Sequence, residues 1–154
     1  MRTWADTYAE LLPEEFYSQR LGLHRRRDWE AVIRDQERRG GGVTVARCAR
    51  GLAGLCQYGP SEDPDDDPQE VAHIHRLYVH PACQRRGVGG SLLADVAARR
   101  LGPGVTSLSL WVLEADPRAR AFYERLGWQP DGARRFDGAA DVRYRRAAEA
   151  TRPS

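Results

Sequence analysis

The stretch VAHIHRLYVHPACQRRGVGGSLLADVAARR, residues 71–100, decides how the chain is expected to fold. Residues 71–79 combine β-branched, aromatic and aliphatic side chains and stop just before Pro81, which is typical of a strand. Glycines then mark a turn, and residues 87–101 carry apolar side chains on one side, as an amphipathic helix does. The stretch therefore predicts a strand, a tight turn and a helix in direct succession.

The sequence before this stretch predicts helices and a hairpin. Residues 3–38 are expected to be helical because apolar side chains recur at helical spacing, and three consecutive glycines end the last helix. Residues 43–48 and 52–58 are separated by a tight turn and predict a β-hairpin. Residues 59–70 hold three prolines and a run of acids, so we expect a mobile surface loop there.

The sequence after the stretch predicts one more strand–helix step and a final pair of strands. Residues 105–113 alternate apolar and serine side chains as a strand does, and residues 117–126 predict a helix that Gly127 ends. Residues 128–135 and 141–146 can form a last antiparallel pair. We therefore predict a single α/β domain over residues 1–154, with a mixed, mostly antiparallel sheet of six to seven strands and helices on both faces.

Composition narrows the class of protein. The 154 residues are 41% hydrophobic and 30% charged, which indicates a globular chain, and the net charge of +2 gives no reason to expect a nucleic acid partner. The three cysteines lack paired spacing, which favours a reducing compartment, and no metal-binding motif is present in the sequence. No apolar run approaches the ~20 residues of a membrane helix, so we expect a soluble protein. Together with the cysteines and the missing metal motifs, this predicts a cytoplasmic protein without a metal.

The segment QRRGVGG, residues 84–90, has the properties of a phosphate-binding turn. Backbone N–H groups at the start of a helix lack partners, the helix dipole favours an anion there, and glycine allows close approach. Arg85 and Arg86 add positive charge. A turn of this kind is often only a turn, and neither the dinucleotide-binding pattern nor the P-loop pattern is complete.

The combination of motifs is more specific than this turn. LYVHP at residues 77–81, QRRGVG at 84–89, LWVLEAD at 110–116 and AFYERLGW at 121–128 follow one another in an order that resembles the GNAT superfamily of N-acetyltransferases. The resemblance covers roughly residues 43–146. It implies a GNAT-like sheet with a splayed parallel pair of strands, an acetyl-CoA-binding core at about residues 71–128, acetyl-CoA as co-substrate and an amine as acceptor.

The resemblance also implies roles for individual residues. Tyr123 stands where the family places the tyrosine that protonates the departing thiolate. Asp116 stands where the family usually has asparagine, and capping of the helix that starts at Pro117 is an alternative role for it. The residues implied to bind the cofactor are Leu77, Tyr78, Val79, Arg85, Arg86, Gly87, Val88, Gly89, Gly90, Asp116 and Tyr123.

The general base is left open among several candidates. Many family members carry glutamate on the strand before the turn, where this sequence has His73. Alternation along a strand places His75 on the same face, and either imidazole could deprotonate an ammonium directly or through water. Solvent and Glu114 are further candidates. The implied reaction is direct attack of the amine on the thioester.

Two further functions stay open at this level. The departures at His73 and Asp116 are compatible with a sensor or regulatory module that binds acyl-CoA without catalysis. An unrelated phosphate-binding α/β protein would require the second motif to be accidental. The acceptor could be a small amine, an amino acid or a protein N-terminus, and the sheet edges and arginine-rich C-terminal strand are compatible with a homodimer.

Overall fold

The computed structural model describes residues 26–49, 51–136 and 138–148, so the helical pieces predicted before residue 26 lie outside the described residues. Contacts between residues divide the chain into two compact units. The first unit comprises Met1–Gly59 and Arg76–Leu92, and the second comprises Pro60–His75 and Leu93–Ser154. The single domain over residues 1–154 stays a prediction.

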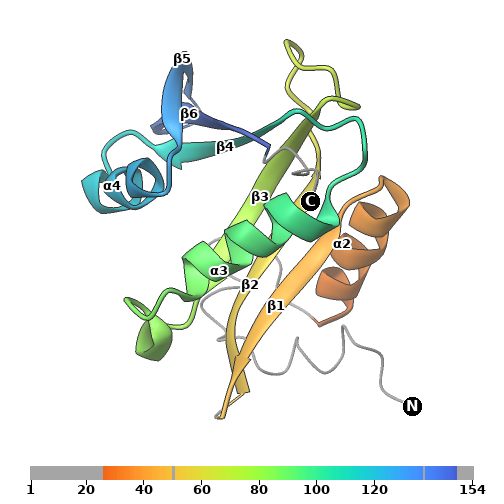
Figure 1. The fold of residues 1–154 in the computed structure, drawn as a ribbon, viewed down its shortest axis with the longest axis vertical. Helices are drawn as coiled ribbons and strands as arrows, with labels where there is room; N and C mark the ends of the chain where they lie inside the picture. Colours follow the sequence, from red (N-terminus) through yellow and green to blue (C-terminus); the bar gives the residue numbers. More distant parts are fainter. Residues whose placement is uncertain (1–25, 50, 137, 149–154) are drawn as a thin grey trace, which may run out of the picture. The chain divides into compact units, whose positions relative to one another are not determined.

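The elements confirm the predicted mixed α/β class (Figure 1). Within the described residues, six strands form one sheet in the order β1-β2-β3-β4-β6-β5, in which β3 and β4 are parallel while β1·β2, β4·β6 and β5·β6 are antiparallel. None of the described helices is long and apolar enough to cross a membrane. The elements are α2 (Arg26–Arg38), β1 (Gly42–Cys48), β2 (Gly51–Pro60), β3 (Val71–Val79), η2 (Pro81–Cys83), α3 (Val88–Asp95), η3 (Val96–Arg100), β4 (Ser107–Leu113), α4 (Pro117–Arg125), β5 (Gln129–Phe136) and β6 (Ala140–Ala147).

The first unit is built on the predicted hairpin. β1 and β2 pair from Gly42 opposite Tyr58 to Cys48 opposite Gly51, with one irregularity after Ala46. Helix α2 packs against β1, as Figure 1 shows. The buried apolar side chains of this hairpin and helix exclude water from the unit's interior, which stabilises the pairing. They are Ile33, Leu52, Ala53, Leu55 and Cys56.

Gly54 allows α3 to lie close to β2. A Cβ atom added at Gly54 would stand 2.6 Å from the Tyr78 carbonyl oxygen and 3.2 Å from side-chain atoms of Val88 and Leu92. The first turn of α3 and the end of β3 therefore meet at a point where only glycine fits without displacing backbone.

The second unit has a clear division between an apolar and a polar sheet face. On β4, Leu108, Leu110 and Val112 are buried, and on β6 the residue opposite Leu110 is Tyr144, which is fully buried. Alternation sends the intervening side chains to the other face. Buried Trp128, which lies just before β5, adds to the apolar core.

Candidate functional site

The turn between β3 and α3 combines unusual backbone conformations. His80 caps the short helix η2, and its Nδ1 accepts a hydrogen bond from the Ala82 N–H at 3.1 Å. Arg85 then has a φ of 67° and Gly87 a φ of 79°. Positive φ is costly for a residue with a side chain, so its presence at Arg85 marks a turn whose shape the surrounding structure imposes.

The backbone of this turn is exposed at the start of a helix. Helix α3 begins at Val88, directly after Gly87, and the N–H groups of a first helical turn lack helical acceptors. Left-handed residues beside a helix start make neighbouring N–H groups converge into a concave surface. Arg85, Arg86 and Gly87 are exposed, and a Cβ at Gly87 would meet nothing within 4 Å, so the backbone is open to approach.

The end of β3 leads directly into this turn. Leu77, Tyr78 and Val79 are half-buried, and the His80 N–H donates to the Ala53 carbonyl at 2.7 Å, which fixes the strand end to β2. The first unit therefore contains this strand end and the whole predicted phosphate-binding segment, from Gln84 to Gly90.

A buried polar chain that the sequence did not suggest lies beside this strand end. Gln57 Nε2 donates to Gln36 Oε1 at 2.8 Å, and Arg76 Nη1 donates to Gln57 Oε1. The chain links α2, β2 and β3 within the first unit. Burial lowers the pKa of Arg76.

Tyr123 lies on α4 in the second unit, among aromatic side chains. Its half-buried ring makes an edge-on contact with the Trp128 ring at 6.0 Å and a tilted contact with the Tyr144 ring at 6.4 Å. Its carbonyl oxygen accepts hydrogen bonds from the N–H groups of Leu126 and Trp128, each at 3.0 Å. The ring contacts place this side chain in an aromatic cluster of the second unit.

Asp116 caps α4, which confirms the capping role considered for it. Its Oδ1 accepts a hydrogen bond from the Ala119 N–H at 3.1 Å, and Pro117 occupies the first turn. Arg120 then fixes the helix to the sheet, because it donates to the Tyr144 hydroxyl at 3.0 Å and to the Glu114 carbonyl at 3.3 Å. The Glu114 carboxylate pairs with exposed Arg134 at 2.6 Å.

His73 and His75 lie together on β3 in the second unit. Their ring centroids are 5.0 Å apart, and His73 Nδ1 lies 2.8 Å from the Oγ of Ser109, its partner in the parallel pairing of β3 and β4. Burial, followed by the charge of His75, lowers the pKa of His73 to about 4. His73 is therefore neutral at neutral pH.

His73 and Ser109 belong to a polar face of the second unit. Ser109 lies opposite Arg145 on β6, and Trp111 lies opposite Arg143. Two guanidinium groups lie over the Trp111 ring, with Arg135 at 4.5 Å and Arg143 at 5.5 Å from its centroid. The residues of this polar face are His73, Ser107, Ser109, Trp111, Arg143 and Arg145.

The acidic loop, residues 61–67, is anchored on the polar face, which corrects the expectation of a mobile loop. Arg143, only 6% exposed, donates to Asp63 Oδ2 at 3.2 Å and to both Asp65 oxygens at 2.8 and 2.6 Å. Arg145 donates to Asp66 Oδ1 at 2.9 Å. The hydrogen bond from Arg143 lowers the pKa of Asp65 to about 2.

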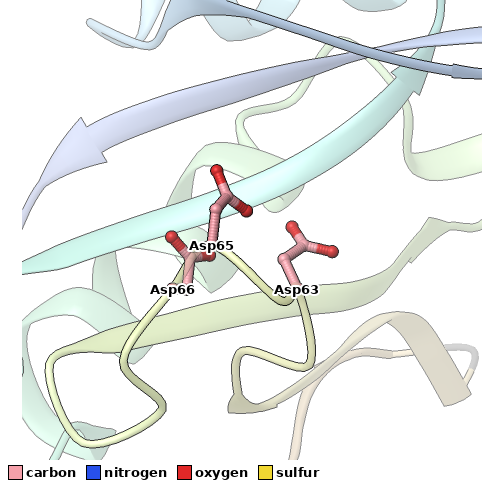
Figure 2. Close-up of side chains that lie close together, drawn as sticks. All are labelled: Asp63, Asp65 and Asp66. Carbon is pink, nitrogen blue, oxygen red and sulfur yellow. The ribbon is translucent and has the colours of Figure 1, made fainter.

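Among the described residues, the acidic loop carries the cluster of side chains that could hold a metal ion. Carboxylate oxygens of Asp63, Asp65 and Asp66 lie within 4.8 Å of one another, and Figure 2 shows the three side chains gathered on the loop. All three nevertheless accept hydrogen bonds from Arg143 or Arg145. We therefore assign these carboxylates to loop anchoring.

Comparisons with known proteins place this arrangement in a family. The sequence profile of the Acetyltransferase (GNAT) family matches residues 4–128, and the chain belongs to this family. Mycothiol acetyltransferase of Kineococcus radiotolerans is 42% identical over 77 residues, which cover 50% of this chain and 23% of that protein. The chain spans less than two thirds of the length of the curated relatives that it matches.

Solved structures share the fold over nearly the whole chain. Ribosomal-protein-alanine N-acetyltransferase from Brucella melitensis has a TM-score of 0.76 at 18% identity, covering 95% of this chain and 96% of that one. A phosphinothricin acetyltransferase from Sinorhizobium meliloti, solved in complex with acetyl-CoA, has a TM-score of 0.75 at 16% identity, covering 96% and 85%. These likenesses show the fold, in agreement with the predicted GNAT-like sheet.

Proposed function

We propose that the chain is an N-acetyltransferase that transfers an acetyl group from acetyl-CoA to the primary amine of a small molecule or a protein N-terminus. The observation that carries the proposal is the turn from Arg85 to Gly90, with its two left-handed residues directly before α3. A chain of this family with an open, positively charged turn after β3 is suited to bind a pyrophosphate.

The first unit would hold the donor. Arg85, Arg86 and the N–H groups from Gly87 to Gly90 would bind the pyrophosphate, while the backbone at Leu77 to Val79 would pair with the pantetheine arm. A backbone N–H at this strand end would also polarise the thioester carbonyl as negative charge develops on its oxygen. Asp116 stays a proposed cofactor-binding residue, in addition to its capping role.

The second unit would supply the proton transfers. A coenzyme A thiol resembles a cysteine thiol with a pKa of about 8.5, so a tyrosine near about 10 can protonate the departing thiolate. Tyr123, held by Trp128 and Tyr144, is the proposed acid. His73 or His75 would take the proton of the amine, and the amine would attack directly without a covalent enzyme intermediate.

One observation favours a second function, an acyl-CoA-binding sensor or regulatory module. The pKa of His73 is lowered to about 4, so its imidazole is a weak acceptor for the proton of an ammonium group. A chain that binds the thioester but lacks an effective base would report on acyl-CoA without consuming it.

The test compares two glycines that differ in position but match in conformation. Gly87 and Gly138 have φ values of 79° and 75°, and both have open space where a Cβ would stand. We expect calorimetric titration to show acetyl-CoA binding to the wild type and to Gly138→Glu, and loss of binding in Gly87→Glu because its carboxylate repels the pyrophosphate. Equal binding by both variants would remove the donor site from this turn.

An acceptor screen then separates the enzyme from the sensor. Acetyl transfer to any amine that Tyr123→Phe slows by about 10² or more supports the enzyme with Tyr123 as acid. Binding of acetyl-CoA without transfer to any amine class supports the sensor. We also propose a cytoplasmic location and leave a homodimer as a prediction that sedimentation can check.

A further inference from the structure

Ser109 holds one specific nitrogen of His73. It is fully buried on β4, directly opposite His73 in the parallel register, and its Oγ is 2.8 Å from Nδ1 of the imidazole. This spacing is a full-strength hydrogen bond, and it leaves the other ring nitrogen, Nε2, for a different partner.

The direction of this hydrogen bond follows because the buried Ser109 hydroxyl requires an acceptor for its proton. A serine hydroxyl carries one proton, and leaving it without an acceptor in a buried place costs about 1–3 kcal/mol. Among the described residues, Nδ1 of His73 is the side-chain partner of Ser109. The hydroxyl proton therefore goes to Nδ1, which must then be the unprotonated nitrogen of the ring.

The His73 imidazole that makes this hydrogen bond is neutral. The charges that act on His73 come from His75 on its own strand, from Asp63 and Asp66 of the acidic loop, and from Arg135 on β5. Burial and the charges of His75 and Arg135 lower the pKa of His73, whereas the charges of Asp63 and Asp66 raise it. A neutral imidazole with an unprotonated Nδ1 carries its proton on Nε2.

We propose that Ser109 is a positioning residue which keeps the proton of His73 on Nε2, so that His73 acts as a hydrogen-bond donor and His75 is the histidine that accepts the proton of the amine. This inference rests on the proposed acetyl transfer. It assigns different tasks to two histidines that the sequence could not distinguish, because a nitrogen that already carries a proton cannot receive another.

The tautomer itself is measurable without activity. We would record two-bond ¹H–¹⁵N correlation spectra of the ¹⁵N-labelled full chain near neutral pH, with His73→Gln to assign the His73 signals. The expected result is an unprotonated Nδ1 and a protonated Nε2 in the wild type, a shift toward the other tautomer in Ser109→Ala, and restoration in Ser109→Thr. A proton found on Nδ1 in the wild type overturns the proposal.

Kinetics separate the two histidines. A glutamine amide nitrogen lies near the place of Nε2 and can donate, whereas an asparagine amide nitrogen lies nearer Nδ1. We expect His73→Gln to lower kcat/KM by less than about tenfold, the worth of one neutral hydrogen bond, with the wild-type pH profile and a smaller loss than His73→Asn. His75→Gln should lose about 10²–10⁴, as removal of a base does, together with the acidic limb of the profile.

The outcomes distinguish this inference from the proposed function. If His73→Gln shows the larger loss and changes the pH profile, His73 is the base and the inference fails while acetyl transfer stands. If no variant and no wild-type protein transfers acetyl, the proposed enzyme fails, and the spectra still decide the tautomer.

Discussion

Acidification should destabilise the protein through His73. Burial, then the charge of His75, lowers the pKa of this imidazole from 6.5 to about 4 in the folded chain. The unfolded chain then binds the proton more tightly than the folded chain, so this contribution to stability is full above about pH 6.5 and is lost as the pH falls toward about 4. The gap corresponds to about 3 kcal/mol in total, of which about 2 kcal/mol is lost between about pH 7 and about pH 5.

Urea unfolding at these two pH values measures the loss, with tryptophan fluorescence as the probe. His73→Gln removes the titrating group, so the wild type should lose about 2 kcal/mol more than this variant over the same interval. The pKa of Asp65 is lowered to about 2, and its contribution is lost only below the range of an ordinary carboxyl, which keeps the two effects apart. Equal losses in wild type and His73→Gln would refute the burial argument.

Three further predictions concern packing, ion pairs and capping. Arg143→Met should lower the free energy of unfolding by about 3 kcal/mol because it removes a buried guanidinium that pairs with Asp63, Asp65 and Asp131. Arg134→Met at the exposed Glu114 pair should cost less than about 1 kcal/mol. Equal effects in urea unfolding would contradict the difference in burial. Gly54→Ala should cost about 1–3 kcal/mol because its Cβ meets the Tyr78 carbonyl, while Gly102→Ala, which has open space, should cost nothing in the same assay. Asp116→Ala should lower stability by about 1 kcal/mol through loss of the cap, and Asp116→Asn should retain most of it in thermal unfolding; a loss in Asn as large as in Ala would remove the capping argument.

The parts of the fold that the sequence predicts are those set by local patterns. The alternation in residues 105–113, the glycines after β3 and the Asp116–Pro117 start of α4 each determine structure through neighbours in the chain. The hydrogen bond between His73 and Ser109 depends instead on the register of two strands far apart in sequence, which periodicity does not reveal.

The acidic loop shows why polarity alone was a poor guide. A run of aspartates looks the same in a sequence whether the carboxylates face water or accept hydrogen bonds from buried Arg143. The useful signal was the pair Arg143 and Arg145, which alternation places on one face of β6. The buried chain of Gln36, Gln57 and Arg76 gave no comparable local signal.

The anchor at Arg143 also has a consequence for the order in which the molecule can form. Asp63 and Arg143 are 80 positions apart, and Asp66 and Arg145 are 79 apart, so neither contact can exist until β6 has been synthesised. During synthesis from the N-terminus, the carboxylates of the acidic loop stay in water until β6 has been made. Joining such distant segments is slow because a long loop has to close first. Docking of β6 beside β4 is therefore the step that completes this half of the protein.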